Sequence, residues 1–184
     1  MLSKALLEQA AVTLQSGGVV AYPTEAVYGL GCDPASGDAI QRICRIKQRP
    51  RRAGLILVAA ELDQLTGWID PQPGELEQLA QATQVPTTWI VTAGRLADDL
   101  VTGGRQRIAV RLTEHPLTAD LCLLAGGPLI STSATRRHRP PARHALQVRR
   151  WFGREIDLLL AGNPGGAAQP SQIRDAISGQ ILRS

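Results

Sequence analysis

Short apolar segments of strand length alternate along the chain with segments of helical periodicity. Each apolar run ends at glycine, proline or a polar cluster, which favours buried strands over helices. Helices and strands mixed in this way are typical of an α/β domain built on one sheet. Their alternation is not strict enough to demand an all-parallel sheet. We therefore expect an α/β fold with a twisted, open, mixed sheet flanked by helices.

The periodicity also predicts where the individual elements lie. One helix begins after the candidate cap Ser36 and ends near Lys47. Residues 108–112 alternate between apolar positions and Arg111, which puts this arginine on the opposite face of a strand from Ile108 and Val110. The other expected elements are helices at 3–15 (with Ser3 as cap), 61–68, 74–83, 116–125 and 145–152, strands at 19–22, 54–60, 87–92, 128–130 and 156–160, and a hairpin of 172–177 with 180–183.

Residues 24–34 are expected to form a loop. The segment contains Gly29, Gly31 and Pro34, which are common in turns. Pro23 comes directly before it and lacks the N–H that a strand ladder needs. We therefore expect the chain to leave the sheet at Pro23.

Length and apolar patterning restrict the domain organisation. The 184 residues suffice for one well-buried domain and are too few for two, so we expect a single domain over residues 1–184. No apolar run approaches the roughly 20 residues that cross a bilayer, and the N-terminus lacks a signal-peptide pattern. A soluble, cytoplasmic protein without membrane contact is the expectation. The three widely spaced cysteines fit neither a disulfide framework nor a zinc site, and we expect buried thiols.

The charge balance favours anionic partners. A formal net charge of +4 suits nucleotide triphosphates or RNA. Aromatic residues make up only 3% of the chain, which argues against binding of single strands by base stacking. Residues 136–154 contain seven arginines. This segment is either an ordinary solvated face or the entrance to a site that attracts anionic ligands. RNA binding through such a basic surface stays open.

Familiar nucleotide-binding and nucleophile motifs do not occur in the chain. It contains no Gly-x-x-x-x-Gly-Lys-Ser/Thr loop, no Gly-x-Gly-x-x-Gly turn after a strand and no Gly-x-Ser-x-Gly elbow. Any ATP site must therefore be unconventional. Polar clusters instead follow the ends of expected strands and helices, where open α/β sheets commonly bind ligands. These clusters are residues 22–25, Lys47 with Arg49, Arg111, and residues 131–133.

Five short motifs occur in a fixed order along the chain. None is rare alone, but together they resemble the YrdC-like threonylcarbamoyl-AMP synthase family, in its single-domain bacterial type, over essentially the whole chain. The motifs are Tyr-Pro-Thr-Glu at 22–25 with Gly-Leu-Gly at 29–31, Lys-Gln-Arg-Pro at 47–50, Ala-Val-Arg at 109–111 with His-Pro at 115–116, Ser-Thr-Ser-Ala at 131–134, and Pro-Ser-Gln-Ile-Arg-Asp at 170–175.

The resemblance implies a YrdC-like fold and a nucleotidyltransferase. Such an enzyme makes threonylcarbamoyl-AMP and pyrophosphate from L-threonine, bicarbonate and ATP. A tRNA-modifying complex would then use the adenylate to install threonylcarbamoyladenosine. Mg²⁺ is expected as the counterion of ATP, with no protein ligand that can be named. A non-catalytic RNA-binding or ribosome-maturation factor is the alternative, and a different small-molecule enzyme on the same fold is a third possibility.

The resemblance also implies the site residues. Lys47, Arg49 and Arg111 form the expected catalytic set. Lys47 and Arg49 would neutralise the triphosphate, and the planar guanidinium of Arg111 suits the carboxylate of threonine or the carbamate. The remaining expected contacts are Thr24, Ser131 and Ser171 on the threonine or carbamate side, and Ser133 and Arg183 on the ATP side.

Each of these residues also has an ordinary structural interpretation. Thr24 and Ser171 could be turn residues, and Lys47 with Arg49 could be solvated charges near a helix end. Arg111 could form a structural ion pair. The general base stays open between Glu25 and His115. The chain departs from the family pattern at Ala26, where many relatives have threonine, at Thr135, where the family has asparagine, and at Val85-Pro86, where a Pro-Gly-Pro is usual.

Overall fold

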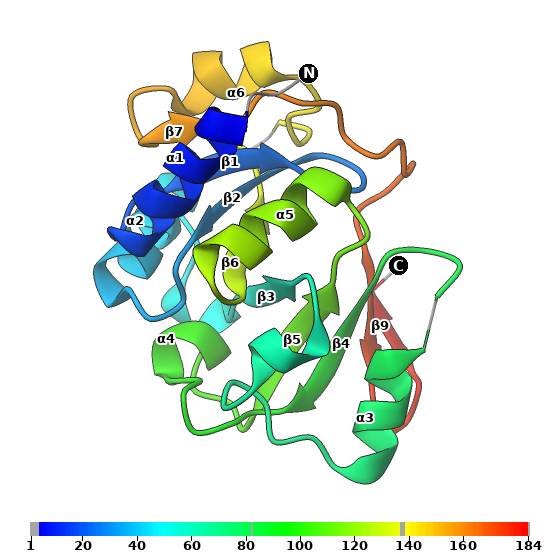
Figure 1. Cartoon of the computed structure of the whole chain (residues 1–184). Coiled ribbons are helices and arrows are strands. Elements are labelled where there is room, and N and C mark those ends of the chain that lie inside the picture. The colour runs from blue at the N-terminus through cyan, green and yellow to red at the C-terminus, as the bar shows by residue number, and fades with distance from the viewer. Residues whose placement is uncertain (1–3, 82, 137–138, 184) are drawn as a thin grey trace.

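A computed structural model describes residues 4–81, 83–136 and 139–183. Within these residues one sheet of nine strands runs through the molecule in the order β7-β1-β2-β6-β3-β5-β4-β8-β9 (Figure 1). The pairs β1–β7, β3–β5 and β4–β8 are parallel and the other neighbours are antiparallel. The expected open, mixed sheet is therefore confirmed. The strands are β1 (Val20–Pro23), β2 (Tyr28–Cys32), β3 (Ile56–Ala59), β4 (Thr87–Thr92), β5 (Arg107–Leu112), β6 (Leu129–Ser133), β7 (Leu158–Leu159), β8 (Gln172–Asp175) and β9 (Ile181–Arg183).

The helices lie close to their expected ranges, with three differences. The expected helix at 61–68 is only the short 3₁₀ helix η2 (Leu62–Leu65), and neither the short helix α4 (Asp99–Thr102) nor the 3₁₀ helix η1 (Arg51–Ala53) was expected. Ser36 caps α2 as expected by accepting a hydrogen bond from the Ala39 amide at 3.4 Å. The expected cap Ser3 lies outside the described residues. The other helices are α1 (Lys4–Gln15), α2 (Gly37–Lys47), α3 (Pro73–Ala80), α5 (Pro116–Ala125) and α6 (Ala145–Phe152).

Apolar side chains pack against both faces of the sheet. On one face α1 and α5 lie side by side and cover Tyr22, Val58 and Leu129 (Figure 1). The larger core lies on the opposite face and includes Leu57 and Val110. The three cysteines are buried free thiols, as expected. Among the described helices none is long and apolar enough to cross a bilayer.

The segment expected to be a loop contains a strand. β2 pairs with β1 in antiparallel register, and Pro23 lies opposite Tyr28 inside the pairing. A Cβ atom on Gly31 would lie 2.5 Å from the Tyr22 hydroxyl and 2.6 Å from the carbonyl oxygen of Ile130. The glycine there makes room for a buried tyrosine under the strand, and it does not mark a turn. The actual turn is shorter and spans residues 24–27.

Candidate functional site

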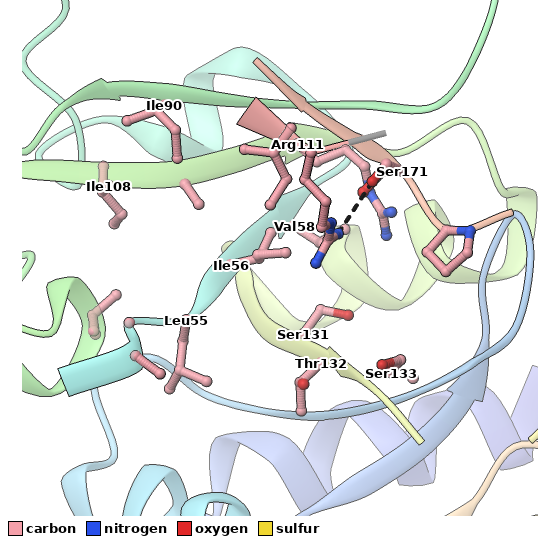
Figure 2. A pocket seen from close by; sticks show the side chains of 18 of the residues that line it. Leu55, Ile56, Val58, Ile90, Ile108, Arg111, Ser131, Thr132, Ser133 and Ser171 are labelled. Atoms are coloured by element: carbon pink, nitrogen blue, oxygen red, sulfur yellow. Dashed lines mark hydrogen bonds between the residues drawn. The ribbon is translucent and has the colours of Figure 1, made fainter. Parts of the chain in front are cut away.

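A cavity of about 600 Å³ opens on the sheet where β2, β3, β5 and β6 meet the C-terminal hairpin of β8 and β9. Strand alternation supplies part of its polar wall, because Val110 of β5 belongs to the core and does not line the cavity, whereas Arg107 and Arg111 lie on the opposite face of the strand and do. Figure 2 shows Arg111 reaching into this cavity, with Val58, Ser131 and Ser171 around it. Seven of the eight expected site residues line the cavity: Thr24, Arg49, Arg111, Ser131, Ser133, Ser171 and Arg183.

Arg111 and Glu25 form a buried ion pair in the cavity wall. Only 8% of Arg111 and 9% of Glu25 are exposed, and Arg111 Nη2 lies 3.3 Å from Glu25 Oε2. Glu25 Oε1 accepts hydrogen bonds from the Thr113 hydroxyl at 2.7 Å and the Glu114 amide at 3.3 Å. Burial would raise the pKa of Glu25, but Arg111, Thr113 and the amides outweigh burial and hold this pKa below its usual range. Glu25 is therefore a carboxylate that stays ionised beside Arg111.

The ion pair leaves part of its hydrogen-bonding capacity unused. Within the described part of the chain, Glu25 Oε2 and Arg111 Nε are buried without a hydrogen-bond partner. A buried group of this kind costs free energy, and such sites are commonly completed by a ligand or a small rearrangement. The sequence pointed to Arg111 but not to Glu25 as its partner. The one available signal was the position of Glu25 directly after Thr24 in the first motif.

Positive charge dominates the cavity wall. Of the residues that line the cavity, Glu25 is the one carboxylate, whereas five are arginines. Arg49 donates to the carbonyl oxygens of Gly54 at 2.8 Å and Ala53 at 3.2 Å, so backbone dipoles hold it without neutralising it. Arg105 is held in the same way, and its place in the wall had no signal in the sequence. The five arginines are Arg49, Arg105, Arg107, Arg111 and Arg183.

Hydroxyl groups line the cavity between the arginines. Thr24 donates to the Val27 carbonyl at 2.8 Å and closes the turn between β1 and β2. Ser171 shares a 2.8 Å hydrogen bond with Thr88, and its carbonyl accepts from Arg183 at 3.2 Å. A Cβ atom on Gly29 would lie 3.3 Å from both Ser131 Oγ and Thr24 Cγ2, so glycine keeps the space between these hydroxyls open.

Lys47 does not line the cavity. Its ammonium group donates to the carbonyl oxygens of Ser133 at 2.6 Å and Thr135 at 2.9 Å. Burial, with smaller contributions from Arg49 and Arg136, lowers the pKa of Lys47 to about 8. In this structure the ammonium group thus contacts the end of β6, and the expected contact with the triphosphate stays a prediction.

The arginine-rich segment at 136–154 is not part of the cavity wall among the residues described. Arg136 pairs with Glu155, donates to the Trp151 carbonyl and lies 4.7 Å from the Phe152 ring. Arg139 lies 5.6 Å from the ring of Trp151. Residues 137 and 138 lie outside the described residues. At least Arg136 therefore has a structural partner instead of a free charge.

Acidic and metal-binding side chains do not gather in the described part of the chain. No group of three His, Cys, Asp or Glu side chains there is arranged to hold a metal ion. One carboxylate oxygen of Glu25 accepts hydrogen bonds from Thr113 and Glu114, and the other oxygen pairs with Arg111.

Comparison with known proteins identifies close sequence relatives. The family model Sua5_yciO_yrdC, described as "Telomere recombination", matches residues 12–184. The chain is 50% identical to the threonylcarbamoyl-AMP synthase of Halorhodospira halophila over 178 residues, which cover 96% of this chain and 93% of that protein. It is also 50% identical to the threonylcarbamoyl-AMP synthase of Stenotrophomonas maltophilia over 181 residues, 97% of each chain.

Solved structures share the fold. P. abyssi Sua5 complexed with L-threonine superposes with a TM-score of 0.88 at 29% identity. The match covers 96% of this chain and 53% of that one, so the chain spans about half the length of Sua5. E. coli YciO superposes with a TM-score of 0.86 over 99% of this chain and 90% of that one, and at 24% identity it supports the fold alone.

Proposed function

The chain belongs to the Sua5/YciO/YrdC family, and from this premise we propose that its cavity makes threonylcarbamoyl-AMP and pyrophosphate from L-threonine, bicarbonate and ATP. The observation that carries the proposal is the positive charge of the cavity wall: among the described lining residues Glu25 is the one carboxylate, and four arginines besides the paired Arg107 line the cavity, namely Arg49, Arg105, Arg111 and Arg183. Joining a carbamate to a nucleotide brings several negative charges together, and such a reaction needs positioned cations more than a protein nucleophile.

Arg111 defines the threonine side of the cavity in this proposal. Its guanidinium is buried and has one carboxylate partner, Glu25, and its further donors can bind a carboxylate ligand. Thr24, Ser131 and Ser171 surround this position with hydroxyls that can bind the carboxylate or the carbamate. Glu25 and His115 are not assigned as bases. His115 contacts the Asn163 carbonyl at 3.0 Å, which fits a structural role.

The ATP side of the cavity is assigned to Arg49, Ser133 and Arg183, with Lys47 behind them. Arg49 and Arg183 supply charge for the triphosphate, and Ser133 supplies a hydroxyl. Lys47 has three ammonium hydrogens and gives two to carbonyl oxygens, which leaves one for a phosphate. Mg²⁺, bound to the phosphates as part of the nucleotide substrate, would neutralise charge that the arginines do not.

The reaction follows from this arrangement without a covalent enzyme intermediate. The amine of threonine combines with bicarbonate to give a carbamate and water. A carbamate oxygen then attacks the α-phosphorus of ATP, and the bond to the β-phosphate breaks so that pyrophosphate leaves with the electron pair. We further propose that the adenylate passes to a tRNA-modifying complex in the cytoplasm. Direct RNA binding by residues 136–154 stays a prediction.

The proposal is tested by pyrophosphate release from ATP, measured with threonine and bicarbonate each omitted in turn. We expect release to require both compounds and to be lost in Lys47→Ala and Arg111→Ala. Release without threonine, or none under conditions where a relative is active, would overturn the proposal. The relatives support the catalytic function and not the non-catalytic alternative. That alternative predicts tight, salt-dependent RNA binding that survives Arg111→Ala.

A further inference from the structure

The end of β6 is held by side chains that stand behind the cavity wall. Figure 2 shows Ser131, Thr132 and Ser133 following one another along this strand at the edge of the cavity. Just beyond the strand, Ala134 donates to the Tyr28 carbonyl at 2.7 Å and accepts from the Ala142 amide at 2.8 Å. The backbone that carries Ser133 is therefore fixed on both sides.

Lys47 fixes the carbonyl groups of the same segment. Its ammonium group binds the Ser133 and Thr135 carbonyls, and the Ser133 carbonyl also accepts from the Thr135 amide at 2.9 Å. These contacts place the positive charge of Lys47 on the backbone of Ser133, which favours an anion as a ligand of this residue.

Thr135 contacts the Ser133 hydroxyl directly. Thr135 Oγ1 donates to Ser133 Oγ at 3.2 Å. A hydroxyl has one proton to give, and a hydroxyl that accepts from a neighbour keeps its own proton for another partner. Ser133 lines the cavity, so its proton is available to a ligand there. Hydrogen bonds in such a chain also strengthen one another.

We propose that Thr135 is a positioning residue that makes Ser133 a hydrogen-bond donor toward a phosphate oxygen of the nucleotide. This inference rests on the proposed function and adds a residue behind the site. Thr135 stands where the family pattern described above has asparagine, so a hydroxyl takes the place of an amide beside Ser133. Lys47 holds the backbone and Thr135 orients the hydroxyl.

The test is a double-mutant cycle on ATP affinity, measured by titration calorimetry and as the KM for ATP. Thr135→Val removes the hydroxyl at nearly constant volume, and we expect ATP affinity to fall about 5-fold to 10-fold, the value of one hydrogen bond. Thr135→Ser restores the hydroxyl and is expected to bind ATP within about 2-fold of the wild type. In a Ser133→Ala background, Thr135→Val is expected to add no further loss. The KM for threonine is expected to change little in all three.

Controls separate this role from simple destabilisation. Thr13 donates to the Gln9 carbonyl on the exposed face of α1, and Thr13→Val is the matched loss of a hydroxyl away from the cavity. If Thr135→Val does not fold, Thr135→Ala carries the same comparison. Additive losses in the cycle, or no rescue by Thr135→Ser, would overturn the inference. Calorimetry measures ATP affinity without turnover. An inactive wild type would therefore overturn the proposed function, while the calorimetric cycle would still decide the role of Thr135.

Discussion

Arg107 and Arg111 lie on the same face of β5 and have different surroundings. Arg107 pairs with two carboxylates, Glu75 at 2.8 Å and Asp175, and donates to the Ile90 carbonyl at 2.6 Å. Arg111 faces one carboxylate, Glu25 at 3.3 Å, which also serves Thr113 and Glu114. Arg107 therefore has two carboxylate partners within the fold, whereas Arg111 has one that also accepts from other donors. This difference supports the proposal that Arg111 is the arginine that binds substrate.

The largest expected effect is the loss of activity in Arg111→Ala. Removal of a buried guanidinium that binds a carboxylate costs on the order of 3–4 kcal/mol, so kcat/KM for threonine should fall about 100-fold to 1000-fold. Steady-state pyrophosphate release at varied threonine measures it. Arg107→Ala, assayed below its unfolding temperature, is the matched control and should retain most of this kcat/KM.

The next effect is a loss of stability, and it is expected for Arg107→Ala. Arg107→Ala leaves Glu75, with a side chain only 1% exposed, without its cation. An uncompensated buried charge costs about 2–4 kcal/mol, although Thr92 and Gln72 still donate to Glu75. Denaturant unfolding measures the loss. If Arg107→Ala unfolds at the wild-type midpoint, the structural role of Arg107 is wrong.

A smaller effect is expected for Glu25→Gln. This change keeps the shape of the side chain and removes the charge that holds Arg111 in place. We expect the KM for threonine to rise about 10-fold, a loss of about 1.4 kcal/mol in binding, while the KM for ATP changes less. Glu75→Gln is the matched change at Arg107 and should leave both constants unchanged. Equal changes in the two KM values for Glu25→Gln would contradict a specific role beside Arg111.

The smallest effect is a pH dependence that arises from Lys47. Burial first, and then Arg49 and Arg136, lower the pKa of Lys47 from 10.5 to about 8. Between these values the unfolded chain binds more protons than the folded one, so this group makes stability rise with pH across that window. Binding of ATP should weaken around pH 8, where the ammonium of the folded protein loses its charge. The KM for ATP should rise a few-fold from about pH 7 to about pH 9, and less in Lys47→Arg, which stays charged. A KM that is independent of pH in the wild type would contradict this assignment.

Much of the sheet and most of the site residues were predictable because they follow from periodicity and motif order. Alternation in β5 was enough to place Arg111 opposite the core. β2 was missed because Gly29 and Gly31 suggested a turn, whereas they make room for Tyr22 and for the cavity between hydroxyls. Contacts of a glycine with side chains on neighbouring strands depend on the tertiary fold, so they cannot be read from the residues around that glycine.

The partners of the site residues were harder to predict than the residues themselves. Glu25 follows β1 and Arg111 lies on β5, and since these strands are not neighbours in the sheet, only the tertiary fold brings the two side chains together. Lys47 was expected at the triphosphate, and the structure places its ammonium on the carbonyls behind Ser133. A spacing in sequence identifies a cation near a site, but the direction of its side chain is decided by tertiary packing.

The most direct test of the account is calorimetric titration of L-threonine into Arg111→Lys and Arg107→Lys. Both changes keep a positive charge and remove the planar guanidinium. The account predicts that Arg111→Lys loses at least about 10-fold in threonine affinity and that Arg107→Lys binds threonine like the wild type but unfolds more easily. Equal losses of affinity in the two variants, or a loss confined to Arg107→Lys, would contradict the claim that the guanidinium of Arg111 is the one that binds the threonine carboxylate.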